Sequence, residues 1–275
     1  MIYDELPGIN TTPAPAASTP LVGYKDPTGL ASFIKAVLIG CIVLTFGLIY
    51  FAWNGYEYFQ ALSRSPAYLS GQSVDIDYSV SGLQALLILG YVVVILTLLV
   101  TFLMWVYRTC KNAHALGAAN LKYTPGWAVG WFFIPFANIV MPYMVMQEIY
   151  KASRHPIQWR KVPGSKMIFA WWILGLGSNV MSRSSVNLEI TNASLEQLLF
   201  FQQLVIGSHV VDIVVSGLLF LIVTEISDYQ NAVFRYLSEN PDEHPAASQS
   251  AEMQQGAPVR PRKTETEATP LCQKT

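Results

Sequence analysis

Long stretches without charged side chains divide this chain. Residues 36–56 and 78–107 carry no charge and are almost wholly apolar, and residues 197–224 are interrupted only by His209 and Asp212. A bilayer core needs about 20 apolar residues per helix, so each stretch is long enough to cross it. A shorter uncharged run, flanked by Lys166 and Arg183, completes the set. The pattern predicts an all-α membrane domain with four transmembrane helices, over about 33–56, 83–107, 166–183 and 198–224. A buried helix of a soluble protein is the alternative, mainly for the third run.

A fifth apolar run, residues 127–146, is predicted to dip into the membrane without crossing it. Pro135 and Pro142 interrupt any helix there. The loops on both sides of the run are basic, and short basic loops stay in the cytoplasm. Their cations are Arg108, Lys111 and Lys122 before the run, and Lys151, Arg154, Arg160, Lys161 and Lys166 after it. We therefore expect four spans with both termini cytoplasmic, and a re-entrant or interfacial Trp/Pro-rich segment over residues 125–153.

An amphipathic helix is predicted after Pro142, over residues 142–153. At 100° per residue Gln147, Glu148 and Lys151 share one arc and apolar side chains fill the other, with Met144 the misfit. Such a helix lies in the plane of the membrane interface. The alternative, an amphipathic helix packed on the rest of the protein, remains open.

Composition supports a membrane class and excludes others. Charged residues make up 13% of the chain, against about 25% in an ordinary soluble domain. The net charge of −1 argues against a nucleic-acid partner, and three cysteines exclude a disulfide scaffold. Residues 1–29 and 239–275 are rich in Pro, Thr, Ser and other polar or small residues, and we expect disordered tails flanking a membrane domain over 30–238.

The predicted cytoplasmic stretch resembles a known family. Residues 108–117 read RTCKNAHALG, and residues 124–153 contain PGWAVGW, PFAN and PY motifs followed by QEIYKAS. Together these motifs resemble the bacterial membrane proteins grouped as domain of unknown function 4328. The matching positions are Asn112, Leu116, Gly117, Pro125, Gly126, Trp127, Gly130, Trp131, Pro135, Asn138, Pro142 and Glu148, and more loosely Trp171, Trp172, Asn179 and Gln230. The resemblance implies a multi-span protein of the bacterial inner membrane and supplies no catalytic or ligand residue.

An intramembrane polar seam is the first candidate for chemistry. His209 and Asp212 lie three residues apart in the fourth predicted span, and Gln202 and Ser216 fall on the same arc. Ionisable residues at bilayer depth are costly and are functional hypotheses by default. The seam therefore predicts a proton relay or an ion or substrate contact. The alternative is a structural seam to another helix, for example to Asn179 or Thr97.

A basic cytoplasmic surface is the second candidate. Its members, candidate contacts for anionic lipid head groups, are Arg108, Lys111, Lys151, Arg154, Arg160 and Lys161. The same charges could serve only as the topological signal. Phosphate-binding loops, zinc-protease motifs and nucleophile elbows are absent from the sequence, and we expect no cofactor or metal. The leading hypothesis is a non-enzymatic module that binds lipid or another membrane protein through its cytoplasmic interfacial surface. A small channel or transporter subunit using the polar seam is the alternative, and an intramembrane enzyme is third.

Overall fold

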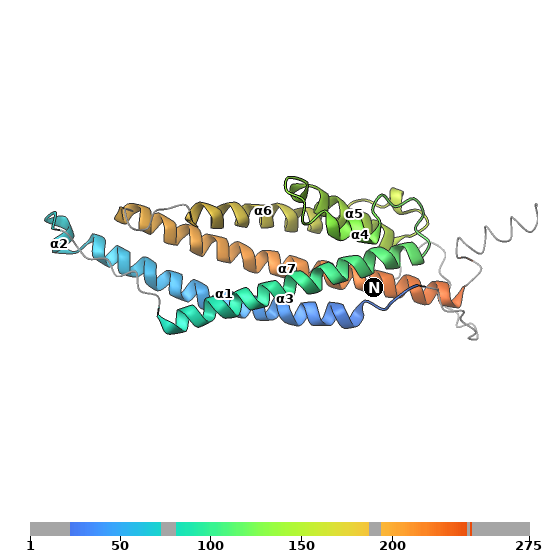
Figure 1. The fold of residues 1–275 in the computed structure, drawn as a ribbon, viewed down its shortest axis with the longest axis horizontal. Helices are drawn as coiled ribbons and strands as arrows, with labels where there is room; N and C mark the ends of the chain where they lie inside the picture. Colours follow the sequence, from blue (N-terminus) through green and yellow to red (C-terminus); the bar gives the residue numbers. More distant parts are fainter. Residues whose placement is uncertain (1–22, 73–80, 187–193, 241–242, 244–275) are drawn as a thin grey trace, which may run out of the picture.

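Four long helices form an elongated bundle in the computed structural model, which describes residues 23–72, 81–186, 194–240 and 243 (Figure 1). These helices are α1 (Thr28–Ser63), α3 (Gly82–Ala115), α6 (Lys166–Val186) and α7 (Leu195–Glu239). The described residues contain helices and turns and no strand. The predicted all-α class is confirmed for this part of the chain.

Three of the long helices, α1, α3 and α7, are both long enough and apolar enough to cross a membrane. Only 6% of the most apolar stretch of α3 is buried inside the protein, so its apolar side chains face outward. Such a surface suits lipid. The fourth predicted span, α6, has 21 residues and is about 31 Å long. Its composition is less apolar, and it is not among the helices that are apolar enough to cross a membrane.

Serines begin two of the long helices. Ser81 accepts a hydrogen bond from the backbone N–H of Gln84 at the start of α3. Ser194 and Gln197 form a reciprocal capping box at the start of α7. Each of these two helices therefore has a defined start, at the end of the bundle opposite the basic loops.

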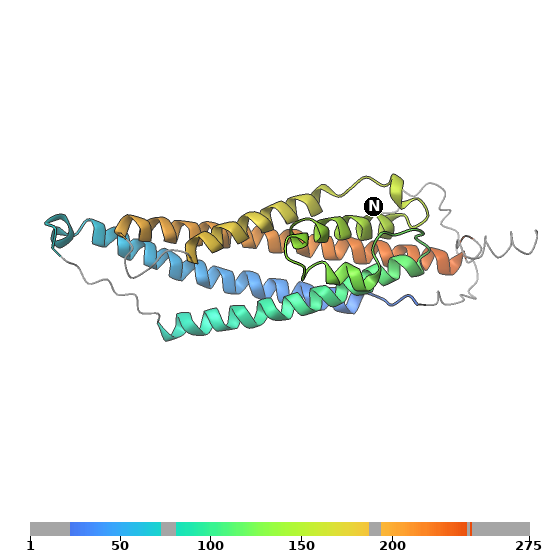
Figure 2. The ribbon, with the colours of Figure 1, turned by 45° about the horizontal axis from the view of Figure 1, so that its top comes forward.

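The described chain begins and ends at the same end of the bundle. The start of α1 and the end of α7 lie there in both views, and the short α2 (Pro66–Leu69) lies at the opposite end (Figures 1 and 2). Helix α7 packs against α1 and α6, and α1 also packs against α3. The helices exceed their predicted apolar spans, because α1 already includes Thr28 and α7 continues to Glu239. The predicted tails 1–29 and 239–275 are therefore helical at their inner edges and otherwise lie almost wholly outside the described residues.

The connection between α3 and α6 folds at this same end. It contains α4 (Pro125–Gly130), a 3₁₀ turn at Ala137–Ile139, α5 (Met141–Arg154) and a second turn at Trp159–Lys161. Helix α5 has 14 residues and is about 21 Å long, which is less than the roughly 30 Å of a bilayer core. No helix of this connection is long enough to cross, as the charge pattern predicts.

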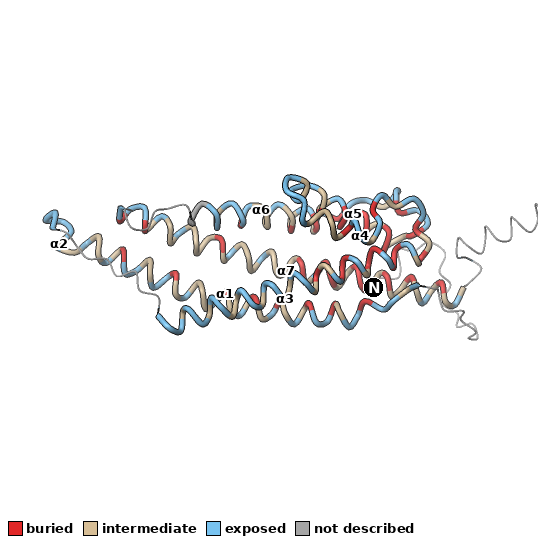
Figure 3. Tube along the Cα trace, in the orientation of Figure 1, coloured by how far each residue is buried: buried red, intermediate tan, exposed pale blue. Residues whose placement is uncertain are grey.

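The main core also lies at this end, where α1, α3, α5, α6 and α7 meet (Figure 3). The sequence left open whether α5 lies free in the interface or packs on protein, and the structure shows packing. Val145, Met146 and Ile149 are buried in the main core. Gln147 and Glu148, the expected solvent-facing arc, are buried as well. The polar arc is covered by neighbouring loops, and only Met144, the misfit, is exposed.

Candidate functional site

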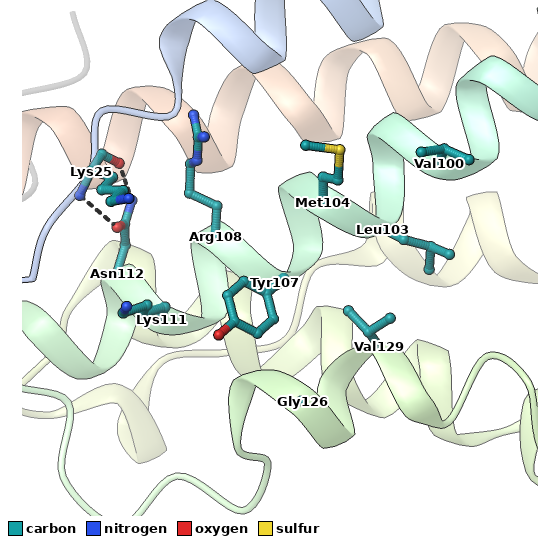
Figure 4. A pocket seen from close by; sticks show the side chains of 10 residues that line it. All are labelled: Lys25, Val100, Leu103, Met104, Tyr107, Arg108, Lys111, Asn112, Gly126 and Val129. Atoms are coloured by element: carbon teal, nitrogen blue, oxygen red, sulfur yellow. Dashed lines mark hydrogen bonds between the residues drawn. The ribbon is translucent and has the colours of Figure 1, made fainter.

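A cavity of about 550 Å³ runs along the outer face of α3 at the basic end of the bundle (Figure 4). Helix α4 forms one side, and the segment that leads into α1 closes one end. Its lining residues are Lys25, Val100, Leu103, Met104, Tyr107, Arg108, Lys111, Asn112, Gly126 and Val129. We call this cavity the α3–α4 groove.

One stripe of α3 forms the floor of the groove. Its lining positions between 100 and 112 recur three and four residues after Val100 and then at every further turn, which places them on one face of a helix. Val100, Leu103 and Met104 make the inner half apolar. Arg108 and Lys111 make the outer half basic. The groove therefore changes from apolar to cationic along its length.

Helix α4 leaves room for the groove because of its first residues. Pro125 occupies the first helical turn, where its missing N–H has no cost. Gly126 follows, and a Cβ added there would meet nothing within 4 Å. Val129 is one helical turn further on and adds an apolar wall.

Asn112 holds Lys25 at the mouth of the groove. The Asn112 side chain accepts from the backbone N–H of Lys25 at 3.0 Å and donates to its carbonyl at 2.7 Å. The same Nδ2 donates to Oε1 of Gln230 at 3.0 Å. Asn112 thus pairs with protein groups through both its oxygen and its nitrogen, and its role in the groove is to position Lys25.

Gln230 continues this network into the core. Its Nε2 donates to the carbonyl of Thr109 at 2.8 Å and to Oγ of Ser153 at 2.9 Å. Gln230 is fully buried. One amide side chain of α7 therefore joins α3, α5 and, through Asn112, the segment before α1. Only the family resemblance pointed to this residue, because a lone glutamine in a polar stretch carries no pattern of its own.

Positive charge dominates the groove mouth. Lys25, Arg108 and Lys111 line it, and its lining residues include no acid. The nearest carboxylate beside Arg108 is Asp26, whose pKa is lowered mainly by hydrogen bonds from the hydroxyl and N–H of Thr28. Arg108 itself donates from Nη1 to the backbone carbonyl of Asp26 at 3.4 Å.

Several family-motif residues hold the loops around α5. The Glu148 carboxylate accepts from the backbone N–H groups of Lys122 and Tyr123, both at 3.1 Å. Gln147 makes a reciprocal pair with the backbone of Ser165 on the other side of α5. Gly117 ends α3 with φ = 92°, a left-handed conformation that favours glycine. These residues act in folding.

The loop over residues 131–140 exposes apolar side chains. Phe133 is 65% exposed and Phe136 is 88% exposed, and Ile139 and Val140 are exposed beside them. Phe136 also has φ = 65°, a region that bulky residues rarely adopt. The motif residues Pro135 and Asn138 are exposed in this loop, whereas Trp127, Gly130 and Trp131 lie at its base in and just after α4. Water is a poor environment for such a loop.

The six predicted lipid contacts do not form one patch. Arg108 and Lys111 line the α3–α4 groove. Lys151 lines a second cavity of about 280 Å³. Arg154 lies over the ring of Tyr229, with 5.9 Å from its guanidinium carbon to the ring centre. Arg160 lies over Trp159 and donates to the carbonyl of Asn120, and Lys161 is exposed beside it.

The polar seam joins α7 to α6 and α3. Asp212 accepts a hydrogen bond from Ser178 of α6, and its Oδ2 lies 3.7 Å from Nδ1 of His209. The His209 ring meets Tyr91 of α3 edge to face, with 6.4 Å between ring centres. Asn179 and Thr97, the two examples given for a structural seam, instead bond to carbonyls of their own helices.

Within the described part of the chain, the other two members of the seam make no hydrogen bond to this pair. Gln202 packs against α1, where its amide nitrogen lies 2.8 Å from the position that a Cβ on Gly55 would take. Ser216 is half-buried on α7. A side chain larger than that of glycine at position 55 would therefore clash with Gln202 unless Gln202 moved.

Comparison with known proteins identifies a family. A family model described as a domain of unknown function (DUF4328) matches residues 73–228, more than half of the chain. No curated protein and no solved structure matches the chain. The matched region includes α3, the whole connection with α4 and α5, α6, and most of α7.

Proposed function

This chain belongs to the family of domain of unknown function 4328, and we propose that it is a non-enzymatic membrane module whose cytoplasmic end binds anionic lipid. One observation carries the proposal. The connection between α3 and α6 contains an exposed apolar loop and five basic side chains, and it folds at one end of an apolar bundle. Apolar side chains enter the hydrocarbon and cations meet anionic head groups, so this end suits the surface of an anionic leaflet.

The proposed topology has four spans, with α6 as the fourth and both termini in the cytoplasm of a bacterial cell. Two features support it. Helix α6 runs alongside α7 and is about 31 Å long. Among the loop cations only Arg64 and Arg183 fall at the opposite end, as the distribution of Lys and Arg in short loops requires.

Cysteine labelling tests this placement. For the experiment Cys272 is replaced by serine. The two remaining cysteines, Cys41 and Cys110, are buried and should not react with the label. A cysteine replacing the exposed Gln158 should react with a membrane-impermeant reagent only from the cytoplasm. Labelling from outside would contradict the four-span topology.

A matched position tests membrane contact of the apolar loop. An environment-sensitive dye on a cysteine replacing Phe136 should emit as in hydrocarbon and be quenched by brominated lipid. The same dye at Gln158 should report water. Equal, water-like emission at both positions would contradict insertion of the loop.

Lipid preference tests the function itself. Purified full-length protein in neutral detergent should gain more thermal stability from phosphatidylglycerol than from phosphatidylcholine, because a ligand stabilises the state that binds it. Added salt should reduce the difference, since salt screens exposed charges. Equal stabilisation by the two lipids would contradict anionic lipid binding.

The seam supports a second candidate, a channel or transporter subunit. The observation in its favour is His209 Nδ1, a buried nitrogen without a hydrogen-bond partner, 3.7 Å from the Asp212 carboxylate. Asp212→Asn keeps the shape and the Ser178 contact and removes the charge. Loss of proton flux in vesicles, with unchanged folding, would support this function over the leading one.

A further inference from the structure

We propose that the α3–α4 groove binds one anionic phospholipid, with an acyl chain along its apolar half and the phosphate among Lys25, Arg108 and Lys111 (Figure 4). This inference rests on the proposed lipid binding and assigns it to one site. Its starting point is the groove's polarity, which is apolar at one end and cationic at the other.

The groove has the length of one leaflet. Val100 and Lys111 are separated by about 17 Å along α3, at 1.5 Å per residue. Half of a bilayer core is about 15 Å thick. Arg108 and Lys111 follow directly after the uncharged run 78–107, where α3 leaves the hydrocarbon. A lipid lying parallel to α3 therefore places its phosphate at the cations.

Charge decides which lipid fits. Lys25, Arg108 and Lys111 line the groove and no acidic residue lines it, although Asp26 lies beside Arg108 outside the lining. A zwitterionic head group brings its own cation to this mouth and gains less than an anionic one. Tyr107 lines the groove between its apolar and basic halves, at the depth where amphipathic aromatic rings are common.

The mouth is built by the fold, because one of its cations comes from a distant part of the chain. Lys25 precedes α1 and is 83 residues before Arg108 in sequence. The paired hydrogen bonds from Asn112 fix the Lys25 backbone, and Gln230 fixes Asn112. The most buried polar network of this end therefore also positions a groove residue.

Two variants test the site, one by removing positive charge and one by filling the space of the groove. Arg108→Gln with Lys111→Gln removes charge and should weaken phosphatidylglycerol binding about thirtyfold, at the usual contribution of a basic residue near an anionic surface. The control, Lys122→Gln with Lys166→Gln, removes two exposed cations of the same end that are not among the predicted lipid contacts and do not line the groove. It should change binding by no more than about threefold, because distant charges are screened.

The second variant fills the groove. Gly126→Leu adds a side chain where a Cβ meets nothing within 4 Å, so the fold tolerates it and the lipid loses its space. Gly90→Leu is the control, since a Cβ there also meets nothing within 4 Å and Gly90 lies on α3 outside the groove. Both proteins should keep the thermal stability of the parent in detergent without lipid.

Native mass spectrometry of the full-length protein gives the Kd for phosphatidylglycerol and for phosphatidylcholine. We expect one tightly bound phosphatidylglycerol, bound about thirtyfold more weakly by the double charge variant, lost in Gly126→Leu and kept in both controls. Parent-like binding by Gly126→Leu would overturn the groove site while the proposed function stands. If the parent shows no preference for phosphatidylglycerol, the proposed function itself fails. Equal binding of glycerol phosphate, which lacks acyl chains, would overturn the assignment to a lipid.

Discussion

Replacing Gln230 with leucine should destabilise the cytoplasmic end more than any similar change on the surface of α7. The fully buried amide makes three hydrogen bonds, to Thr109, Ser153 and Asn112, at 2.8 to 3.0 Å. A buried hydrogen bond contributes about 1 kcal/mol net, and the Ser153 and Asn112 groups lose a partner. We expect a loss of about 3 kcal/mol in the free energy of unfolding.

Thermal unfolding in detergent measures this loss. At about 2–4 °C per kcal/mol for a domain of this size, Tm should fall by about 6–12 °C. Gln203→Leu is the control, because Gln203 is an exposed glutamine on the same helix. It should leave Tm within about 2 °C. A parent-like Tm for Gln230→Leu, or an equal fall in the control, would refute the assignment of the network as the link among α3, α5 and α7.

Three further predictions concern other contacts of the fold. Glu148→Ala removes two charge-assisted hydrogen bonds to the loop after α3, and should cost about 3 kcal/mol and speed proteolysis of that loop; an unchanged cleavage rate would contradict its role. Ser178→Ala removes the bond to Asp212 and should cost about 0.6 kcal/mol, the usual value within membranes, so a Tm shift above about 5 °C would show a larger role. Burial and Glu225 raise the pKa of Tyr150. Its neutral form therefore stabilises the fold below about pH 10, and stability falls as pH rises further. Tyr150→Phe should flatten that fall in Tm.

Several elements followed from local sequence alone. The uncharged runs gave α1, α3 and α7, because apolar length is the requirement for crossing hydrocarbon and needs no knowledge of neighbours. Pro142 correctly marked the first turn of α5. The apolar runs did not predict where the helices end, however. Helix α7 continues to Glu239, since a helix in contact with other helices extends beyond the membrane through polar residues.

What covers a helix face was decided only by tertiary structure. Periodicity placed Gln147 and Glu148 on a polar arc of α5, and such an arc can face either water or unpaired backbone groups of a loop. The structure covers it with the loops that end at Tyr123 and Ser165, whose backbone N–H groups need acceptors. The same limit applied to the seam, where the partner of Asp212 is Ser178, which the sequence did not single out.

The basic end shows the division most clearly. The sequence predicted that Lys and Arg gather on one side of a bilayer, because that bias is a property of loop composition. It could not show that Lys25 joins Arg108 and Lys111 in one groove while Arg154 and Arg160 pack on aromatic rings. That sorting depends on contacts between segments far apart in the chain, made by Asn112 and Gln230, and on the space left at Gly126. The sequence alone showed that the loop charges are unevenly distributed between the uncharged runs, and the packing of the helices decided which of these charges line one groove.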